Sequence, residues 1–217
     1  MPIDHRHFQK EITKKVSLNY QLFLPDEYDA ASDKKWPFIL FLHGIHRRGS
    51  DIQLLDGYGL TAMAESTKGF EFLVAAPQCP SFSNWPMQRD AVIALVYEVA
   101  TLHKVDAERI YLTGFSMGGN GAWDLAAHYP DLFAAVVPLA GYYDPELAHL
   151  LKDMPVWTFH GDQDDIVSPK NTEAMVDALQ QSGGNVTYTS LPDRKHPIME
   201  DAYGNPALYQ WLLSHKK

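Results

Sequence analysis

Residues 109–119 read RIYLTGFSMGG, a run of β-forming residues that passes directly into Gly-x-Ser-x-Gly and then into a segment of helical composition. A serine on a sharp turn between a strand and a helix needs small neighbours two positions away, and Gly114 and Gly118 occupy those positions. Such a turn exposes the hydroxyl of Ser116, and the first amides of the helix point at any oxyanion formed beside it. A glycine-rich helix start with serine as its N-cap is the structural alternative. The strand-turn-helix context favours a nucleophile.

On both sides of this turn, short apolar runs alternate with longer segments of helical period, which is typical of parallel strands joined by crossover helices. The strands are predicted at residues 16–24, 37–43, 72–77, 109–114, 134–139, 156–160 and 186–191, and the helices at 88–103, 117–128, 169–182 and 206–215. Residues 38–42 are apolar on both faces, as in a strand covered by helices on each side. Residues 16–24 alternate instead, which predicts an antiparallel edge strand. We therefore predict an α/β fold with a mostly parallel twisted sheet and helices on both faces.

Composition and charge limit the class of protein. The chain has 217 residues, 46% of them hydrophobic, which suits a single domain spanning residues 1–217. A formal net charge of −9 and the absence of long Lys/Arg runs argue against a nucleic acid partner. Residues 1–15 hold no apolar stretch of the kind a signal peptide requires, and residues 38–42 fall far short of the ~18 to 20 residues that cross a bilayer. Cys79 is the single cysteine and excludes an intrachain disulfide. We expect a cytoplasmic monomer or homodimer without membrane contact.

A nucleophilic Ser116 requires a base, and the strand-turn-helix arrangement predicts the chain order serine, acid, histidine. Two histidines, His196 and His215, follow a plausible acid downstream of the serine. His215 lies at the end of the chain, where fraying would leave an imidazole without a rigid position. We therefore assign His196, in the loop after the last predicted strand, as the base; a solvated loop histidine is the alternative.

The acid is expected in the loop after the strand at 156–160, where residues 160–167 read HGDQDDIV. This loop offers Asp162, Asp164 and Asp165, and the spacing His-Gly-x-x-Asp-x-x-Val favours Asp164, leaving the other two to support the turn. As a metal site, the same cluster lacks the glycine and the glutamate of an EF-hand loop. We predict no metal and no organic cofactor.

The second oxyanion donor is expected in the loop after the strand at 37–43. There His43-Gly44-Ile45 resembles the His-Gly-x motif, which assigns the amides of Ile45 and Met117 as the two donors. His43 could also be mistaken for a base. Its place at a strand end beside a tight glycine turn favours a structural histidine that is hydrogen-bonded to backbone.

Three residues are predicted to bind substrate. Only residues 142–155 separate two predicted strands after the turn, which leaves little sequence for a cap domain and predicts an open, shallow site. Trp85 and Tyr142 would stack on an aromatic or sugar-linked group, with ordinary loop packing as the alternative. Arg47, together with Arg48, would attract a carboxylate on the substrate, with a solvated pair as the alternative.

Together these motifs resemble the α/β-hydrolase superfamily, in particular the small serine esterases grouped with phospholipase/carboxylesterases, dienelactone-hydrolase-like proteins and predicted peptidases. The resemblance implies a triad of Ser116, Asp164 and His196, with Ile45 and Met117 as the oxyanion donors. It covers most of the chain, through the segments at 20–25, 41–44, 76–80, 114–119, 160–167 and 209–212.

Two departures from the family pattern concern the substrate more than the chemistry. Residues 45–49 read IHRRG where relatives usually carry a small residue and a glutamate, and Lys195 precedes His196 where many have glycine. We predict a serine carboxylesterase that hydrolyses a small-molecule short-chain or aryl ester through an acyl-enzyme on Ser116. A serine peptidase or an acyl-thioesterase with the same triad is the alternative, followed by a non-catalytic binding module of the same fold.

Overall fold

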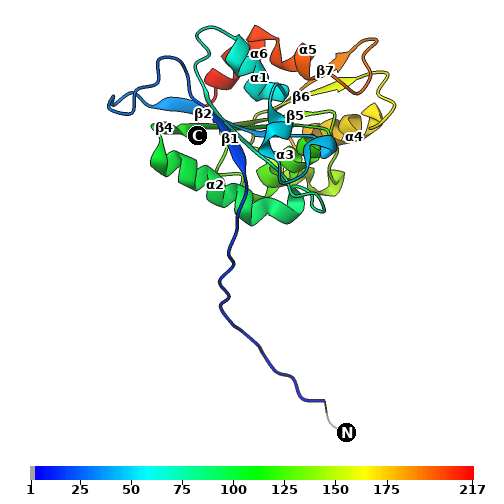
Figure 1. Ribbon diagram of the computed structural model, residues 1–217. Coiled ribbons are helices and arrows are strands. Elements are labelled where there is room, and N and C mark those ends of the chain that lie inside the picture. Colours follow the sequence, from blue (N-terminus) through cyan, green and yellow to red (C-terminus); the bar gives the residue numbers. More distant parts are fainter. Residues whose placement is uncertain (1–2) are drawn as a thin grey trace.

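A computed structural model describes residues 3–217, and one seven-stranded sheet forms its centre (Figure 1). The strands are β1 (Tyr20–Phe23), β2 (Trp36–Leu42), β3 (Leu73–Pro77), β4 (Val105–Phe115), β5 (Ala135–Leu139), β6 (Val156–Gly161) and β7 (Val186–Leu191). Their order across the sheet is β1-β3-β2-β4-β5-β6-β7. β1 pairs antiparallel with β3, whereas the remaining pairs are parallel. The predicted mostly parallel sheet with an antiparallel edge strand is confirmed.

Helices cover both faces of this sheet (Figure 1). They are α1 (Gly59–Ser66), α2 (Arg89–Leu102), α3 (Met117–His128), α4 (Pro169–Gln181), α5 (Met199–Tyr203) and α6 (Pro206–Leu213). Phe38, Leu40 and Leu42 pack in one core with α2, α3 and α4, whereas Ile39 and Phe41 pack in a second core with α1, α5 and α6. Because successive side chains of a strand point to opposite faces, the wholly apolar β2 contributes to both cores.

Several parts of the fold differ from the predicted elements, and β4 begins at Val105, four residues before the predicted strand at 109–114. β1 is shorter than the predicted strand at 16–24, because Tyr20 already pairs with Pro77, the last residue of β3. Residues 44–60, where the sequence pattern predicts neither a strand nor a helix, contain two 3₁₀ helices and the start of α1. The sequence pattern predicts neither α1 nor α5.

The carboxyl ends of the parallel strands bring the loops that follow them to one edge of the sheet. Open α/β sheets build their sites at this edge. Between β5 and β6, the chain forms only the 3₁₀ helix Pro145–Leu151 and no cap domain. Within residues 3–217, no helix has the length and apolar composition needed to cross a membrane.

Candidate active site

Ser116 lies on the sharp turn between β4 and α3. Its backbone has φ 57° and ψ −117°, a conformation that non-glycine residues rarely adopt and that costs about 1 to 3 kcal/mol. A side chain on Gly114 would overlap the backbone of Gly118, and one on Gly118 would overlap the carbonyl of Leu42. The two glycines therefore let α3 begin directly against the ends of β2 and β4. The amide of Ser116 donates to the carbonyl of Leu139 at 2.9 Å and ties the turn to β5.

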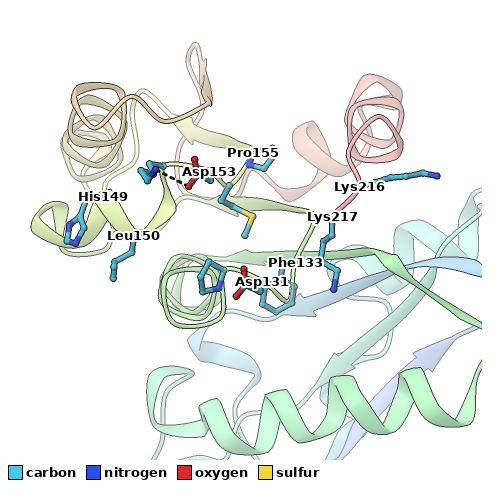
Figure 2. A pocket seen from close by; sticks show the side chains of 12 residues that line it. Asp131, Phe133, His149, Leu150, Asp153, Pro155, Lys216 and Lys217 are labelled. Carbon is cyan, nitrogen blue, oxygen red and sulfur yellow. Dashed lines mark ion pairs between the residues drawn. The ribbon is translucent and has the colours of Figure 1, made fainter.

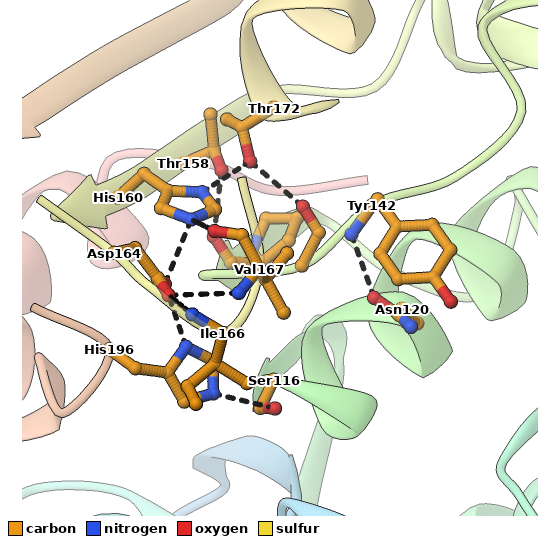
Figure 3. A network of polar contacts seen from close by, with 12 residues as sticks. Ser116, Asn120, Tyr142, Thr158, His160, Asp164, Ile166, Val167, Thr172 and His196 are labelled. Carbon is orange, nitrogen blue, oxygen red and sulfur yellow. Dashed lines mark hydrogen bonds and ion pairs between the residues drawn. The ribbon is translucent and has the colours of Figure 1, made fainter. Parts of the chain in front are cut away.

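The structure brings the three predicted triad residues together (Figure 3). Nε2 of His196 lies 2.9 Å from Oγ of Ser116, and Nδ1 lies 2.7 Å from Oδ2 of Asp164. The ring of Phe115 packs against the imidazole with a centroid distance of 4.8 Å. Since Nδ1 donates to a carboxylate, Nε2 is left to accept the proton of the serine hydroxyl.

Asp164 is the carboxylate of the acid loop that contacts His196, whereas Asp165 pairs with Lys195 at 3.0 Å. Oδ1 of Asp164 accepts from the amides of Ile166 and Val167, each at 2.9 Å. Burial alone would raise the pKa of Asp164, but the hydrogen bonds from His196 and from the two amides outweigh burial and lower the pKa. The acid is therefore held as a carboxylate.

Strand β6 and the loop after β7 are joined at the point where the acid and the base meet. The amide of Gln163 donates to the carbonyl of Arg194 at 3.0 Å. A side chain on Gly161 would overlap the carbonyls of Arg194 and Lys195, so the close approach of the two loops requires a glycine there. Through this contact, the loop that carries Asp164 holds the loop that carries His196 in position.

The two predicted oxyanion donors lie at the amino ends of two helices. Met117 is the first residue of α3 and Ile45 is the first residue of the 3₁₀ helix Ile45–Arg47. First-turn amides have no partner inside their own helix, so both are free to point toward a ligand. Gly118 packs against Leu42 and His43 at the end of β2, which brings the two helix starts to the same edge of the sheet.

His43 is fully buried and holds the loop that carries Ile45. Its Nδ1 donates to the carbonyl of Gly44 at 2.7 Å, and its Nε2 accepts from the amide of Cys79 at 2.9 Å. Burial, opposed in part by the bond to Gly44, lowers the pKa of His43 from 6.5 to about 4. The ring is neutral and has a hydrogen bond at each nitrogen, which agrees with the predicted structural role.

A cavity of about 440 Å³ borders the candidate oxyanion site. It is lined by Asn84, Pro86, Met117, Asn120, Tyr142, Tyr143 and Asp144. Tyr142 is 49% exposed, and its amide donates to Oδ1 of Asn120 at 2.7 Å, which fixes the wall of the cavity to α3 (Figure 3). Tyr142 therefore lines the same cavity as Met117, and its predicted contact with substrate stays a prediction.

The prediction that Trp85 binds substrate is wrong. Trp85 is completely buried, and its indole Nε1 donates to the carbonyl of His43 at 2.9 Å. Gly121 of α3 leaves the space that the indole fills, since a side chain there would overlap Trp85. Trp85 therefore supports the loop after β2, and its neighbours Asn84 and Pro86 line the cavity instead.

The two arginines of the loop after β2 have different contacts. Arg48 donates from Nε to the carbonyl of Ile45 at 3.2 Å and from Nη1 to the carbonyl of Ser83 at 3.0 Å. It joins two loops and is not a free cation for substrate. Arg47 is half-buried, with its guanidinium 4.5 Å from the ring centre of Tyr58. Its predicted contact with substrate stays a prediction.

A larger cavity, of about 660 Å³, lies at the opposite edge of the sheet (Figure 2). Its lining includes Ala134 and Pro155, which immediately precede β5 and β6, and thus the amino ends of these strands. Lys152 and Asp153 in its wall pair with each other at 3.1 Å. Because Ser116 follows the carboxyl end of β4, this cavity is remote from the triad despite its size.

Within residues 3–217, no three His, Cys, Asp or Glu side chains converge as a metal site.

His160, to which the sequence pattern assigns no role, contacts the acid directly. Nε2 of His160 lies 3.0 Å from Oδ2 of Asp164, and Nδ1 lies 2.8 Å from Oγ1 of Thr172 (Figure 3). The signal is present in the motif at 160–167, because a histidine at the end of a buried strand precedes the acid by four positions.

Comparisons with known proteins point to esterases. The sequence pattern of the dienelactone hydrolase family matches residues 83–207, which include Ser116, Asp164 and His196. A bifunctional acetylxylan esterase/xylanase of Neocallimastix patriciarum is 25% identical over 184 residues, which cover 81% of this chain and 26% of that protein. Feruloyl esterase B of Thermothelomyces thermophilus is 29% identical over 139 residues, which cover 58% of this chain and 45% of that protein. The chain thus spans less than half the length of these two relatives.

The crystal structure of a thermostable esterase is also similar to this chain. The two share 30% sequence identity with a TM-score of 0.81, and the match covers 92% of this chain and 60% of the other. The match therefore extends over nearly the whole of this chain.

Proposed function

This chain belongs to the dienelactone hydrolase family, and on that premise we propose that it is a serine hydrolase that cleaves carboxylic esters through an acyl-enzyme. The observation that carries the proposal is the continuous line of hydrogen bonds from Ser116 through His196 to Asp164, at 2.9 and 2.7 Å. The line begins at a serine in a strained backbone conformation beside the first amide of α3. A strained residue at such a position is a hallmark of a functional site.

The proposed reaction has two halves. Oγ of Ser116 attacks the ester carbonyl while its proton passes to Nε2 of His196, and Asp164 stabilises the imidazolium that forms. The negative charge on the carbonyl oxygen is met by the amides of Ile45 and Met117, and one such donor is worth about 3 to 4 kcal/mol of barrier. The alcohol then leaves with the proton from His196. Water, deprotonated by the same imidazole, attacks the acyl-serine, releases the acid and restores the hydroxyl of Ser116.

The cavity beside Met117 supports a short or aryl group in the substrate. A carbonyl oxygen held by the amide of Met117 would place one substituent of the ester in this cavity of about 440 Å³. This volume falls in the usual range for small-molecule sites. Pro86, Tyr142 and Tyr143 supply apolar and aromatic surface, while Asn84 and Asn120 supply polar groups. The short connection between β5 and β6 leaves the cavity open at its mouth, which favours accessible esters over long lipid chains.

Replacing the proposed nucleophile tests this function. We expect Ser116→Ala to lower kcat on p-nitrophenyl acetate by at least about a thousandfold and to abolish labelling by a fluorophosphonate. Ser182→Ala, at the exposed end of α4, is the matched control and should keep wild-type activity and labelling. Full activity in Ser116→Ala, or no labelling of the wild-type protein, would contradict the proposal. Faster cleavage of aminoacyl-p-nitroanilides than of esters would indicate a peptidase instead.

A further inference from the structure

His160 is a buried polar residue in a place that an apolar side chain would fill at lower cost. It lies in β6, where side chains alternate between the two cores, and its ring faces Thr172 of α4. Its exposed fraction is 0%. Burying an imidazole is costly unless its nitrogens are hydrogen-bonded. Both ring nitrogens have hydrogen-bond partners, which offset the cost of burying the imidazole.

The partners of Nε2 decide where a proton lies. Nε2 of His160 is 3.0 Å from Oδ2 of Asp164 and 2.9 Å from the carbonyl of Val167. A carboxylate and a carbonyl can only accept, so Nε2 carries a hydrogen and donates it. His160 is therefore a hydrogen-bond donor to the acid, which is the same role toward Oδ2 that Nδ1 of His196 has at 2.7 Å.

The two oxygens of Asp164 are held in different ways. Oδ1 is fixed by the amides of Ile166 and Val167, whereas the described contacts of Oδ2 are His196 and His160. Without His160, the oxygen that must orient the base would depend on the base alone. We propose that His160 is a positioning residue, which holds Oδ2 of Asp164 in line with Nδ1 of His196. This inference rests on the proposed function of the triad.

The other side of the His160 ring is tied to the substrate cavity. Nδ1 lies 2.8 Å from Oγ1 of Thr172, and the same hydroxyl, which has one hydrogen for these two acceptors, lies 2.8 Å from the carbonyl of Gly141. Gly141 precedes Tyr142, whose amide is held by Asn120 of α3. Figure 3 shows this path from the acid through His160 and Thr172 to the wall of the cavity. His160 thus connects the acid, through Thr172, to α4 and to the segment after β5.

Two substitutions separate the donated hydrogen bond from the space that the ring fills. His160→Phe keeps a ring and removes the donor, and we expect kcat to fall about 10- to 100-fold while KM stays within about twofold. His160→Gln places an amide N–H near the position of Nε2, and we expect it to retain at least about a third of the wild-type kcat. His149→Phe, on the exposed 3₁₀ helix between β5 and β6, is the matched control and should be unchanged.

Proton NMR gives a readout that packing alone would not move. The Nδ1–H of His196, bonded to Asp164, should give a low-field resonance that is retained in His160→Gln and broadened or lost in His160→Phe. If His160→Phe fails to fold, Thr172→Val replaces it, because it removes the hydroxyl that holds Nδ1; we expect about a threefold or larger loss of kcat and a weaker resonance. Wild-type kcat and resonance in the folded donor-less variant, or equal losses in the Gln and Phe variants, would overturn the inference. An active Ser116→Ala would instead overturn the proposed function.

Discussion

Tyr142 and Trp85 show how the surroundings of a single side chain decide its role. Both are aromatic residues in loops at the carboxyl edge of the sheet, yet Tyr142 is 49% exposed beside Met117 and Trp85 is fully buried. The difference comes from the partners that each indole or phenol finds. The indole of Trp85 donates to the carbonyl of His43 and fills the space over Gly121. The Tyr142 side chain remains exposed at the cavity.

The Tyr142 ring is expected to stack on the aryl group of aryl esters and to leave alkyl esters unaffected. A stacked aromatic pair contributes about 0.5 to 1.5 kcal/mol, so Tyr142→Ala should lower kcat/KM for p-nitrophenyl or other aryl esters about 3- to 10-fold relative to methyl or ethyl acetate. Steady-state kinetics on the two ester classes measures the ratio. Tyr97→Ala, an exposed tyrosine on α2, serves as the control and should leave the ratio unchanged. A proportional loss on both classes would show that Tyr142 does not contact the aryl group.

The candidate site could be predicted from the sequence wherever local geometry constrained the residue type. Ser116 is such a case, because the turn from β4 into α3 tolerates only glycine at two nearby positions. The chain order then left few candidates for the base and the acid, and the structure brings His196 and Asp164 to that serine. The burial of Trp85 could not be predicted, because it depends on Gly121, which is distant in the chain. His160, by contrast, stands four positions before Asp164 in the same motif, and only its second partner, Thr172, lies on another element.

At the scale of the elements, α2 and α3 are joined by an ion pair between a half-buried guanidinium and a buried carboxylate. Arg89, the first residue of α2, donates from Nε and Nη2 to the two oxygens of Asp124 on α3 at 2.6 and 2.8 Å. The Asp124 side chain is 3% exposed. A carboxylate at this depth is tolerated only while its partner is present. The pair therefore fixes the position of α3, whose first residues form the turn at Ser116.

Replacing one residue of this ion pair should lower the free energy of unfolding more than replacing both. Arg89→Met removes the bidentate partner of the buried Asp124 and leaves it with His128, whose Nδ1 lies at 3.7 Å, and we expect a loss of about 3 kcal/mol in the free energy of unfolding. The double variant Arg89→Met with Asp124→Leu replaces both charges by apolar side chains and should recover most of that loss. Urea unfolding followed by circular dichroism measures both values. Equal losses in the single and double variants would show that the ion pair has no special cost when it is broken.

The elements that the sequence did not predict lack the features by which helices are recognised. α5 has only five residues, too few to show a helical period, and α1 begins at Gly59 after Tyr58 without a side-chain cap. Met117–His128 and Val186–Leu191, by contrast, have the predicted bounds, since a polar residue precedes each of them and a proline follows within two residues of each end. The alternation of strands and helices repeats along the chain, which is why the sheet as a whole could be predicted while single short helices could not.

For the molecule as a whole, buried polar contacts hold the loops at the carboxyl edge of the sheet in place. His43 is central among them, because it joins the end of β2 to the loop after β3 through Gly44 and Cys79. Trp85 belongs to the same cluster, because its ring packs edge-on against His43 and its indole N–H donates to the carbonyl of His43. Because the ring of His43 is neutral and buried, protonation would break its bond with the Cys79 amide. The stability of the fold is thereby linked to pH.

Acid should weaken the folded state over a defined range. The pKa of His43 is lowered from 6.5 to about 4, so between these values the unfolded chain binds a proton that the folded chain does not. Stability is therefore complete above pH 6.5 and falls by about 3 kcal/mol as the pH approaches 4. The lowered pKa of Asp164 acts in the same direction, but only below its ordinary value of 3.8.

Urea unfolding at pH 7, 5.5 and 4 measures this dependence. His43→Gln cannot take up a proton and should have a shallower fall in the free energy of unfolding over the same range, whatever its absolute stability. An identical pH slope in the wild type and His43→Gln would assign the dependence to other groups.

The position of Cys79 has a practical consequence. Its thiol is the single one in the chain and is fully buried, and burial raises its pKa to about 11. Maleimides and iodoacetamides therefore meet no reactive thiolate on the folded enzyme. A cysteine introduced at Phe82, which is 98% exposed on the same loop, would be the one site that such reagents modify. A fluorophore attached there would report from the loop that contributes Asn84 and Pro86 to the cavity beside Met117, without any need to remove the native cysteine.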